Sequence, residues 1–300
     1  MGDTTLKQLR SLAATVHAGT IAGAAKQLHV TPPAVAQQLR LLERGVGMAL
    51  VQRTDRGLHP TDAGRELLAT TARIEAELTS CDRLLDALRD GRSGTLVFGA
   101  VSTAKYFAPQ LLAAFWATHR EVDIRLVIGN RDETVRCLTD FELDLAIMGR
   151  PPAELDLVIA PIGEHPHVII ASPRHSLAGS GRITQRRLGD ETFLVREHGS
   201  GTRSLADRFF ATAGIEPRIG MEIASNETIK QAVIADLGIA LISAHTVAAE
   251  IEDGRLVVVN VAGFPIVRKW FVVRRPSKRL GPAGELFWEF LADCGAAHFP

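Results

Sequence analysis

Cysteine is scarce in this 300-residue sequence, which has only Cys81, Cys137 and Cys294. Their odd number and wide spacing fit neither a set of disulfide bridges nor a zinc site, so we expect a reducing compartment. The sequence also lacks a basic segment followed by an apolar one at its start, and no apolar run has the length that a bilayer requires. We therefore expect a cytoplasmic protein with no membrane partner.

Signatures of catalysis are missing as well. There is no G-x-S-x-G nucleophile elbow and no metal-ligand spacing. The residues best suited to an enzyme are Glu197, His198 and Ser200, but neighbours in sequence do not establish a catalytic triad. We therefore predict a protein that is not an enzyme and has no catalytic residue, metal or cofactor. With 46% apolar and 23% charged residues, the composition is typical of a globular protein of two or three domains.

The net charge of zero hides an uneven distribution. Residues 1–65 contain eight Lys and Arg against four Asp and Glu. This local basic excess coincides with residues 20–43, whose pattern predicts two short helices joined by a tight turn. Such a helix-turn-helix typically places its second helix in the DNA major groove.

The second helix of this motif has a clear start and two distinct faces. Thr31 as N-cap, with its side chain accepting a backbone N–H, and Pro32 in the first helical position favour helix initiation. Inward positions at helical spacing are Val35, Leu39 and Leu42, and the first helix is expected to pack through Ala22, Ala24, Ala25 and Leu28. Outward positions, predicted to face DNA bases and phosphates, are Pro33, Ala36, Gln37 and Arg40.

Residues 47–61 predict two short strands around a Gly-containing turn, with Arg53 and Arg56 near the tip. An arginine on such a wing can enter the minor groove or contact phosphate beside the recognition helix. The alternative is a solvated hairpin whose charges have no partner.

From Thr61 onward the apolar residues recur at near-heptad distances to about Arg89, which predicts one long helix. A narrow apolar stripe of this kind favours pairing with a second copy of the chain, and hence a dimer. The alternative is packing against the second domain of the same chain. The stripe consists of Leu67, Leu68, Ile74, Leu78, Leu84, Leu85 and Leu88.

Strands and helices alternate after Gly94, which predicts an α/β region of two doubly wound lobes with a ligand cleft between them. Strands are predicted at 95–100, 122–128, 143–148, 157–161, 167–172, 193–196, 219–224, 239–243, 256–261 and 270–273. Helices are predicted at 104–116, 132–140, 204–213, 228–236 and 284–294.

Three junctions at which a strand ends and a helix begins are rich in hydroxyl and amide side chains, at 101–105, 197–203 and 224–228. Free backbone N–H groups and the positive end of the helix dipole make such junctions suitable for an anion. For any single junction, plain helix capping is the more usual role of such residues. Three of them in one bilobed domain favour a small anionic ligand.

The order of helix-turn-helix, arginine wing, long helix and bilobed domain resembles the LysR-type transcriptional regulators over the whole chain. The motifs that carry the resemblance are Ala24-Ala25-Lys26-Gln27-Leu28, Thr31-Pro32-Pro33-Ala34-Val35-Ala36-Gln37-Gln38-Leu39, Leu42-Glu43, Arg53 and Pro60-Thr61-Asp62-Ala63-Gly64. Ala36 stands where the family often has serine, which affects one DNA contact. Val51-Gln52 replaces a frequent Phe-Glu, which affects packing.

The resemblance implies a winged helix-turn-helix at 1–61, a dimerising linker helix at 62–92 and an effector-binding domain, similar to periplasmic binding proteins, at 93–300. Lobe I would comprise 93–162 and 267–300, and lobe II 163–266. The implied DNA contacts are Thr31, Pro33, Ala36, Gln37, Arg40, Arg53 and Arg56. The implied effector contacts are Ser102, Thr103, Ser200, Thr202 and Asn226, with Lys105, Asn130, Arg203 and His245 as further candidates. For His245 a structural hydrogen bond is the alternative.

Within the family, segments 104–109, 150–152, 225–233 and 241–247 are similar to the regulators of Calvin-cycle operons, the CbbR group. That similarity implies activation of carbon-fixation genes and sensing of phosphorylated sugar metabolites or NADPH. It also implies a homotetramer of paired homodimers on promoter DNA and contact with RNA polymerase. Alternatives are a LysR-type regulator of another operon with a carboxylate effector, and a solute-binding protein or α/β enzyme without DNA function.

Overall fold

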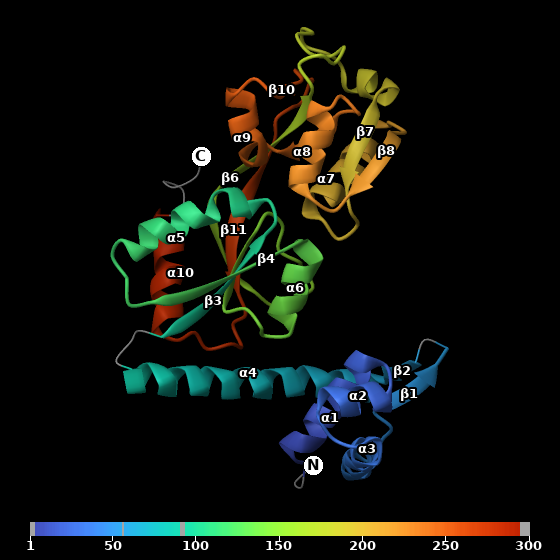
Figure 1. Ribbon diagram of the computed structural model, residues 1–300, viewed down its shortest axis with the longest axis vertical. Helices are drawn as coiled ribbons and strands as arrows, with labels where there is room; N and C mark the ends of the chain where they lie inside the picture. Colours follow the sequence, from blue (N-terminus) through green and yellow to red (C-terminus); the bar gives the residue numbers. More distant parts are fainter. Residues whose placement is uncertain (1–3, 56, 91–93, 295–300) are drawn as a thin grey trace. The chain divides into compact units, whose positions relative to one another are not determined.

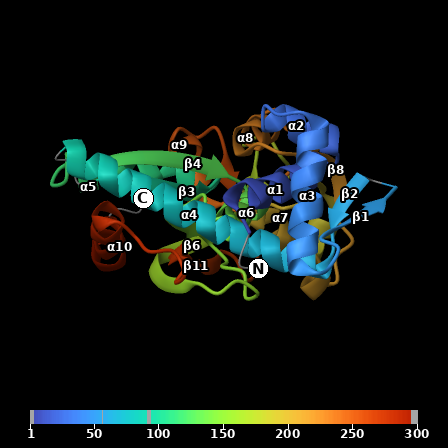
Figure 2. The same cartoon turned by 90° about the horizontal axis from the view of Figure 1, so that it is seen from below.

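The computed structural model describes residues 4–55, 57–90 and 94–294 and divides into two compact units, which meet in sequence between Cys81 and Asp82. The predicted linker is one uninterrupted helix, α4 Asp62–Asp90, in both views (Figure 1, Figure 2). In the described residues no helix is long and apolar enough to span a membrane, and no group of three His, Cys, Asp or Glu side chains is placed to hold a metal ion.

The N-terminal unit is a winged helix-turn-helix built on a small apolar core. Its elements are α1 Leu6–Ala18, α2 Ile21–Gln27, α3 Pro32–Val46, β1 Val51–Thr54 and β2 Gly57–Pro60. As predicted, the stripe of Val35, Leu39 and Leu42 is buried. Two details of the prediction are wrong. Ala22 is exposed, and the Thr31 hydroxyl makes no capping hydrogen bond, although Thr31 is extended and the helix begins at Pro32.

The wing is fastened to the helices through backbone contacts. Strands β1 and β2 pair antiparallel, and the amide of Leu58 donates to the carbonyl of Gly19 over 2.8 Å. The Thr61 hydroxyl donates to the carbonyl of Ala49 over 2.8 Å and accepts the amide of Gly64 over 3.0 Å, so it caps the start of α4. A side chain at Gly64 would overlap the carbonyl oxygen of Leu50. The Pro60-Thr61-Asp62-Ala63-Gly64 motif is therefore the joint between wing and linker helix.

We expect Gly64→Ala to lower the unfolding free energy of the N-terminal unit by about 1–3 kcal/mol or more, because the added methyl group meets a backbone carbonyl that the amide of Thr61 already holds at 3.0 Å. Gly45→Ala in α3 is the control, because nothing lies within 4 Å of its added carbon. That change should instead stabilise the helix by about 0.5–1 kcal/mol. Thermal unfolding followed by circular dichroism measures both, and equal melting temperatures for the two variants would contradict the close contact.

The apolar stripe of α4 has two parts. Near its start Leu67 is buried, Leu68 and Ile74 pack on the same core, and Arg10 of α1 binds both carboxylate oxygens of Glu75, over 2.6 and 2.9 Å. Farther along, Leu78 is 39% and Leu85 is 53% exposed. The side chains of Leu84 and Leu88 lie outside the described residues. The exposed leucines, seven residues apart, are the part of the stripe that a second copy could cover, so self-association stays a prediction.

The C-terminal unit is a bilobed α/β domain, as predicted, and its seven-stranded sheet has the order β10-β6-β11-β5-β3-β4, with β9 also paired to β6 (Figure 1). Strands β3, β4 and β5 are parallel, whereas β11 and β6 are antiparallel, so the doubly wound pattern is only partial. A separate parallel pair, β7 and β8, lies in the second lobe. The strands are β3 Thr95–Val101, β4 Asp123–Gly129, β5 Leu145–Met148, β6 Val158–Ala171, β7 Thr192–Arg196, β8 Arg218–Ile223, β9 Ala240–Ser243, β10 Val257–Val258 and β11 Ile266–Arg274.

The helices cover this sheet in two groups around separate cores. Lobe I has one core cluster around Phe98, Phe107, Phe115 and Trp270, and lobe II has two clusters, on either side of β6. The helices of lobe I are α5 Ala108–Trp116, α6 Arg131–Thr139 and α10 Pro282–Cys294, after the short turn η1 Ala104–Tyr106. Those of lobe II are η2 Gln185–Asp190, α7 Gly201–Ala213, α8 Asn226–Ile234 and α9 Ala244–Glu252.

Two predicted elements have other bounds in the structure, and one helix was missed. The strands expected at 157–161 and 167–172 are one 14-residue strand, β6, which pairs with β11 from Val158 to His167 and with β9 and β10 beyond it. The helix expected at 104–116 breaks at Phe107, because Pro109 begins a new helix. Helix α9 was not predicted. Strands β6 and β11 pass through the predicted lobe boundaries and form the connection between the lobes (Figure 1).

Candidate functional site

The recognition helix presents the predicted DNA-facing residues on one exposed surface. Thr31, Pro33, Gln37 and Arg40 are exposed and Ala36 is half-buried. The opposite face of α3, with Val35, Leu39 and Leu42, is buried in the core. Arg53 is exposed on β1, and Arg56 lies outside the described residues. The exposed side chains of α3 and the wing strand β1 are those that a duplex would meet, and their contacts with DNA stay predictions.

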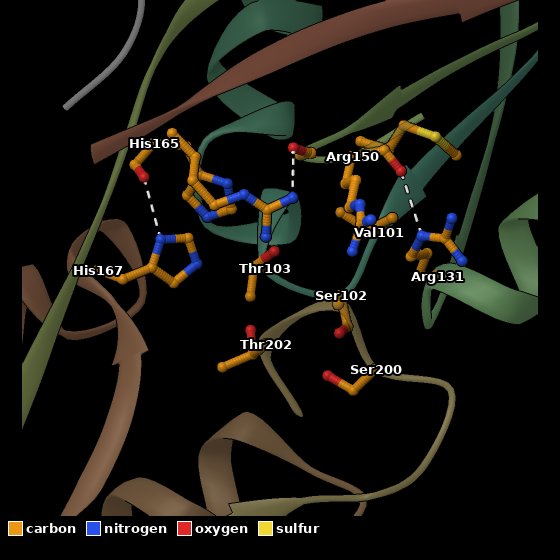
Figure 3. A pocket seen from close by; sticks show the side chains of 13 residues that line it. Val101, Ser102, Thr103, Arg131, Arg150, His165, His167, Ser200 and Thr202 are labelled. Atoms are coloured by element: carbon orange, nitrogen blue, oxygen red, sulfur yellow. Dashed lines mark hydrogen bonds between the residues drawn. The ribbon is translucent and has the colours of Figure 1, made fainter. Parts of the chain in front are cut away.

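A second candidate site is the cavity of the C-terminal unit, which has a volume of about 380 Å³ including its open mouth. It lies where parallel strands β3 and β5 end and where α6 and α7 begin, with β6 and β11 forming one wall (Figure 3). The carboxyl ends of parallel strands are a preferred place for ligands in α/β folds. The cavity is lined by Val101, Ser102, Thr103, Arg131, Met148, Gly149, Arg150, His165, His167, Ser200, Gly201, Thr202 and Arg268.

Hydroxyl groups enter the cavity from both lobes. Ser102 and Thr103 follow β3 in lobe I, and Ser200 and Thr202 stand at the start of α7 in lobe II (Figure 3). Ser200 is the N-cap of this 13-residue helix, yet its hydroxyl makes no capping hydrogen bond. The first backbone N–H groups of α7 and these hydroxyls are donors suited to the oxygens of an anion.

Three guanidinium groups, those of Arg131, Arg150 and Arg268, add positive charge to the cavity. Arg268 donates to the carbonyl of Gly149 over 2.9 Å, and Arg131 donates to the carbonyl of Arg150 over 3.1 Å. Burial and the charges of Arg208, Arg150 and Arg131 lower the pKa of Arg268 to about 10, so it is still cationic at neutral pH. In the part of the chain that the structure describes, Arg131 pairs with Asp132 over 3.3 Å, whereas no carboxylate forms an ion pair with Arg150 or Arg268. The cavity therefore has an unbalanced positive charge that an anion would neutralise.

Two buried histidines complete the wall. His165 and His167 lie two residues apart on β6, so their side chains share one face of the sheet, and their ring centroids are 4.1 Å apart. Nδ1 of His167 lies 3.0 Å from the carbonyl oxygen of His165 and donates to it. The ring of His165 stacks on Trp270 with 3.7 Å between centroids. Gly149 makes room for it, because an added Cβ would lie 2.6 Å from Nδ1 of His165.

Both histidines are neutral in the ligand-free protein, mainly because burial disfavours the charged ring. Burial, together with His167, Arg268 and His245, holds the pKa of His165 well below its ordinary range. Burial and Arg268 lower the pKa of His167 to about 3. In the unfolded chain both groups return to the ordinary histidine pKa of about 6.5.

The stability of the C-terminal unit is expected to fall below pH 6.5, because there the unfolded chain binds protons that the folded histidines do not. For His167 the loss begins at about pH 6.5 and continues toward its folded pKa of about 3. Between pH 7.5 and 5.5 this one group should lower the free energy of unfolding by about 1.4 kcal/mol. Urea titrations at both pH values check it, and His167→Gln should remove this part of the pH dependence. An unchanged pH dependence in the variant would contradict a neutral buried His167.

Of the predicted effector contacts, Ser102, Thr103, Ser200 and Thr202 line the cavity, whereas the other five residues do not. Asn130 caps α6, and Asn226 is buried and donates to the carbonyl of Ser102 over 3.3 Å. The remaining three bind other side chains. Lys105 lies 3.6 Å from Glu227, and Arg203 pairs with Asp207 over 2.9 Å and with Glu222 over 2.6 Å. His245 accepts the indole N–H of Trp270 over 3.1 Å.

The cavity residues that the sequence did not single out are Arg131, Arg150, His165, His167 and Arg268. Arg150 follows the strand predicted at 143–148. It could have been selected as Ser102 was, by its place directly after the end of a strand. His165 and Arg268 are paired in the register of β6 and β11 although about a hundred residues separate them. No local pattern reveals such a pairing.

Family models match both units. The model described as "Bacterial regulatory helix-turn-helix protein, lysR family" matches residues 6–65, and "LysR substrate binding domain" matches residues 89–295. The chain belongs to the LysR family. It is therefore a transcriptional regulator and not an enzyme.

Relatives of this LysR-family chain match it along nearly its full length. The HTH-type transcriptional regulator CbbR of Xanthobacter flavus is 48% identical over 298 residues, which is 99% of this chain and 90% of the relative. The RuBisCO operon transcriptional regulator of Allochromatium vinosum is 39% identical over 294 residues, or 98% and 97% of the two chains.

Solved structures of LysR-type regulators share the fold. The regulatory domain of CcmR from Synechocystis PCC6803, in complex with 2-PG, is 35% identical, has a TM-score of 0.64 and covers 66% of this chain and 95% of that one. Full-length CbnR complexed with its target DNA is 22% identical, with a TM-score of 0.64 over 96% of this chain and 98% of that one. At this identity the likeness to CbnR shows the fold alone.

Proposed function

We propose that this LysR-family regulator controls carbon-fixation genes and that its promoter binding responds to a small phosphorylated metabolite held in the cavity. The observation that carries the ligand class is the cluster of Arg131, Arg150 and Arg268 beside serine and threonine hydroxyls, with no balancing carboxylate among the described ion pairs of Arg150 and Arg268. Similarity to CbbR and to the RuBisCO operon regulator supports the gene class, and the CcmR complex with 2-phosphoglycolate supports the ligand.

The size of the cavity favours one phosphoryl group on a short carbon chain. The cavity is small, because its volume is only about 380 Å³ even with the open mouth included. A phosphorylated metabolite of a few carbons fits this space better than NADPH does. Arginine forks bind phosphate oxygens in pairs, and the α7 N-terminus supplies further donors.

Contacts between the lobes beside the cavity couple a bound ligand to the arrangement of the lobes. Arg196 and Asn226 of lobe II bond to Ser102 of lobe I, and the Tyr106 hydroxyl of lobe I bonds to Glu227 of lobe II. A ligand that touches both lobes favours the arrangement in which its donors converge, and so shifts the population of lobe arrangements. Coupling of this kind typically changes DNA affinity or occupancy by about 5- to 150-fold.

The proposal includes the oligomeric state of the regulator and the compartment in which it binds DNA. A homodimer would form through the exposed stripe of α4, which includes Leu78 and Leu85, and two dimers would give a homotetramer. The recognition residues Thr31, Pro33, Ala36, Gln37 and Arg40 and the wing arginines Arg53 and Arg56 would contact promoter DNA in the cytoplasm, where RNA polymerase is a further partner.

The test combines promoter binding with ligand binding on the full-length protein. We expect specific binding to a RuBisCO-operon promoter fragment that weakens steeply as salt rises, because phosphate contacts release counterions. 2-Phosphoglycolate at a hundred times its dissociation constant should add about 2.7 kcal/mol to the stability of the folded state and change the footprint. Glycolate, which lacks the phosphate, is the matched control. Equal stabilisation by glycolate would indicate a carboxylate effector, and no specific promoter binding at low salt would refute the regulator.

A further inference from the structure

His165 is a buried polar side chain without a partner in the wall of the cavity. It is 4% exposed, and neither of its ring nitrogens has a hydrogen-bond partner in the described structure. A buried imidazole without hydrogen bonds is costly, so such a group needs an explanation. The ring stacks on Trp270 and fits against Gly149, so its position is fixed by packing alone. The hydrogen-bonding capacity of His165 is therefore available to a ligand in the cavity.

The charged and titratable groups around His165 are cationic or basic. Arg268 of β11 is its register partner and shares its face of the sheet. His167 lies next to it on β6, and the ring centroid of His245, from α9, lies 6.2 Å from that of His165. Arg131 and Arg150 add charge from the start of α6 and from the segment after β5. Without an anion, this environment opposes any positive charge on the ring.

An anion in the cavity reverses this balance. Two negative charges between His165 and the guanidinium groups favour the imidazolium form, because a nearby opposite charge stabilises the protonated ring. One N–H of that ring can then donate to the anion.

Resting on the proposal that the cavity holds an anion, we propose that His165 recognises a phosphate-like dianion by binding it together with one proton. The proton comes from solvent and binds the free ring nitrogen of His165 as the anion enters, and it leaves when the anion leaves. The regulator then binds its ligand more tightly at lower pH, and a dianion gains more than a monoanionic carboxylate of the same size. His165 is in this sense a specificity-determining residue of the cavity.

Inorganic sulfate is a suitable probe because it stays a dianion from pH 8 to pH 6, so any change in its binding belongs to the protein. We expect its affinity for the wild-type protein, measured by tryptophan fluorescence or thermal shift, to rise by about tenfold between pH 8 and pH 6. In His165→Gln the affinity should be the same at both pH values and close to the wild-type value at pH 8. His198→Gln is the control, because His198 is an exposed histidine that does not line the cavity. It should keep the wild-type pH dependence.

Imidazole NMR of the wild-type protein gives a second measurement that needs no variant to fold. Addition of sulfate at pH 7 should move one histidine ring from the neutral to the protonated signal. Retained pH dependence in His165→Gln, its loss in His167→Gln, or no newly protonated ring on sulfate binding would each overturn the role of His165. Absence of sulfate and 2-phosphoglycolate binding at every pH would instead refute the anion site itself.

Discussion

Replacement of Arg268 by methionine is expected to weaken binding of 2-phosphoglycolate by at least about thirtyfold, because loss of one partner from a buried charged contact costs about 2–5 kcal/mol. Arg268 is held by its bond to the Gly149 carbonyl and lies opposite His165 in the register of β6 and β11. Methionine keeps much of the volume of the side chain and removes its charge. Isothermal titration calorimetry at constant pH measures the change.

The same substitution should not destabilise the ligand-free protein as a broken ion pair would. Burial and three other arginines already disfavour the charge of Arg268, so its removal relieves repulsion that offsets the loss of its bond to the Gly149 carbonyl, and the melting temperature should change little. Lys269→Met is the matched control, because Lys269 is exposed and, as the next residue of β11, points to the other face of the sheet. Equal affinity losses in the two variants would show that general charge, and not the cavity, holds the ligand.

Gln37→Ala is expected to lower affinity for the promoter site by about 5- to 150-fold and to leave nonspecific DNA binding nearly unchanged. Gln37 is exposed on α3, and a glutamine can bond to both edge groups of adenine in the major groove, which is worth about 1–3 kcal/mol of discrimination. Filter binding with specific and scrambled duplexes at several salt concentrations measures both affinities.

Arg53→Ala tests a phosphate contact, in contrast to the base contact that Gln37→Ala tests. Loss of a phosphate contact should weaken binding to both duplexes and reduce the salt slope by about one. Arg73→Ala, on the exposed side of α4 outside the helix-turn-helix and the wing, should change neither affinity. If Gln37→Ala weakened specific and nonspecific binding alike, Gln37 would contact the DNA backbone or support the fold, and base reading would have to be assigned elsewhere.

The N-terminal unit was predictable from sequence because its signals are local. Thr31 followed by two prolines starts α3, and Val35, Leu39 and Leu42 set its buried face within ten residues. The capping hydrogen bond that the sequence predicts for Thr31 is absent, although the backbone of Thr31 is extended as an N-cap requires. Similarly, Ser102, Thr103, Ser200 and Thr202 were found because each stands where a strand ends or a helix begins, which is also a local signal.

The rest of the cavity depends on contacts between distant segments. His165 and His167 lie in the middle of β6, which prolines at 161 and 166 made look like two strands. Arg268 reaches the cavity only because β11 pairs with β6 in one particular register. Asn226 shows the opposite case, because its junction pattern was correctly recognised but its side chain is used to bond to Arg196 and Ser102.

The pairing of β6 with β11 decides how the lobes can move. Two lobes joined by flexible loops would move about a hinge, with the whole rotation confined to a few backbone angles. Here the paired strands β6 and β11 of the larger sheet run from one lobe into the other, with one irregular step between Trp270 and Phe271, so a rotation of the lobes has to twist this pair. Rotation of the lobes therefore strains the pairing of β6 with β11 over several residues, and only small angles are accessible at low cost. Trp270 stacks on His165, so a ligand that contacts His165 lies beside the irregular step of this strand pair.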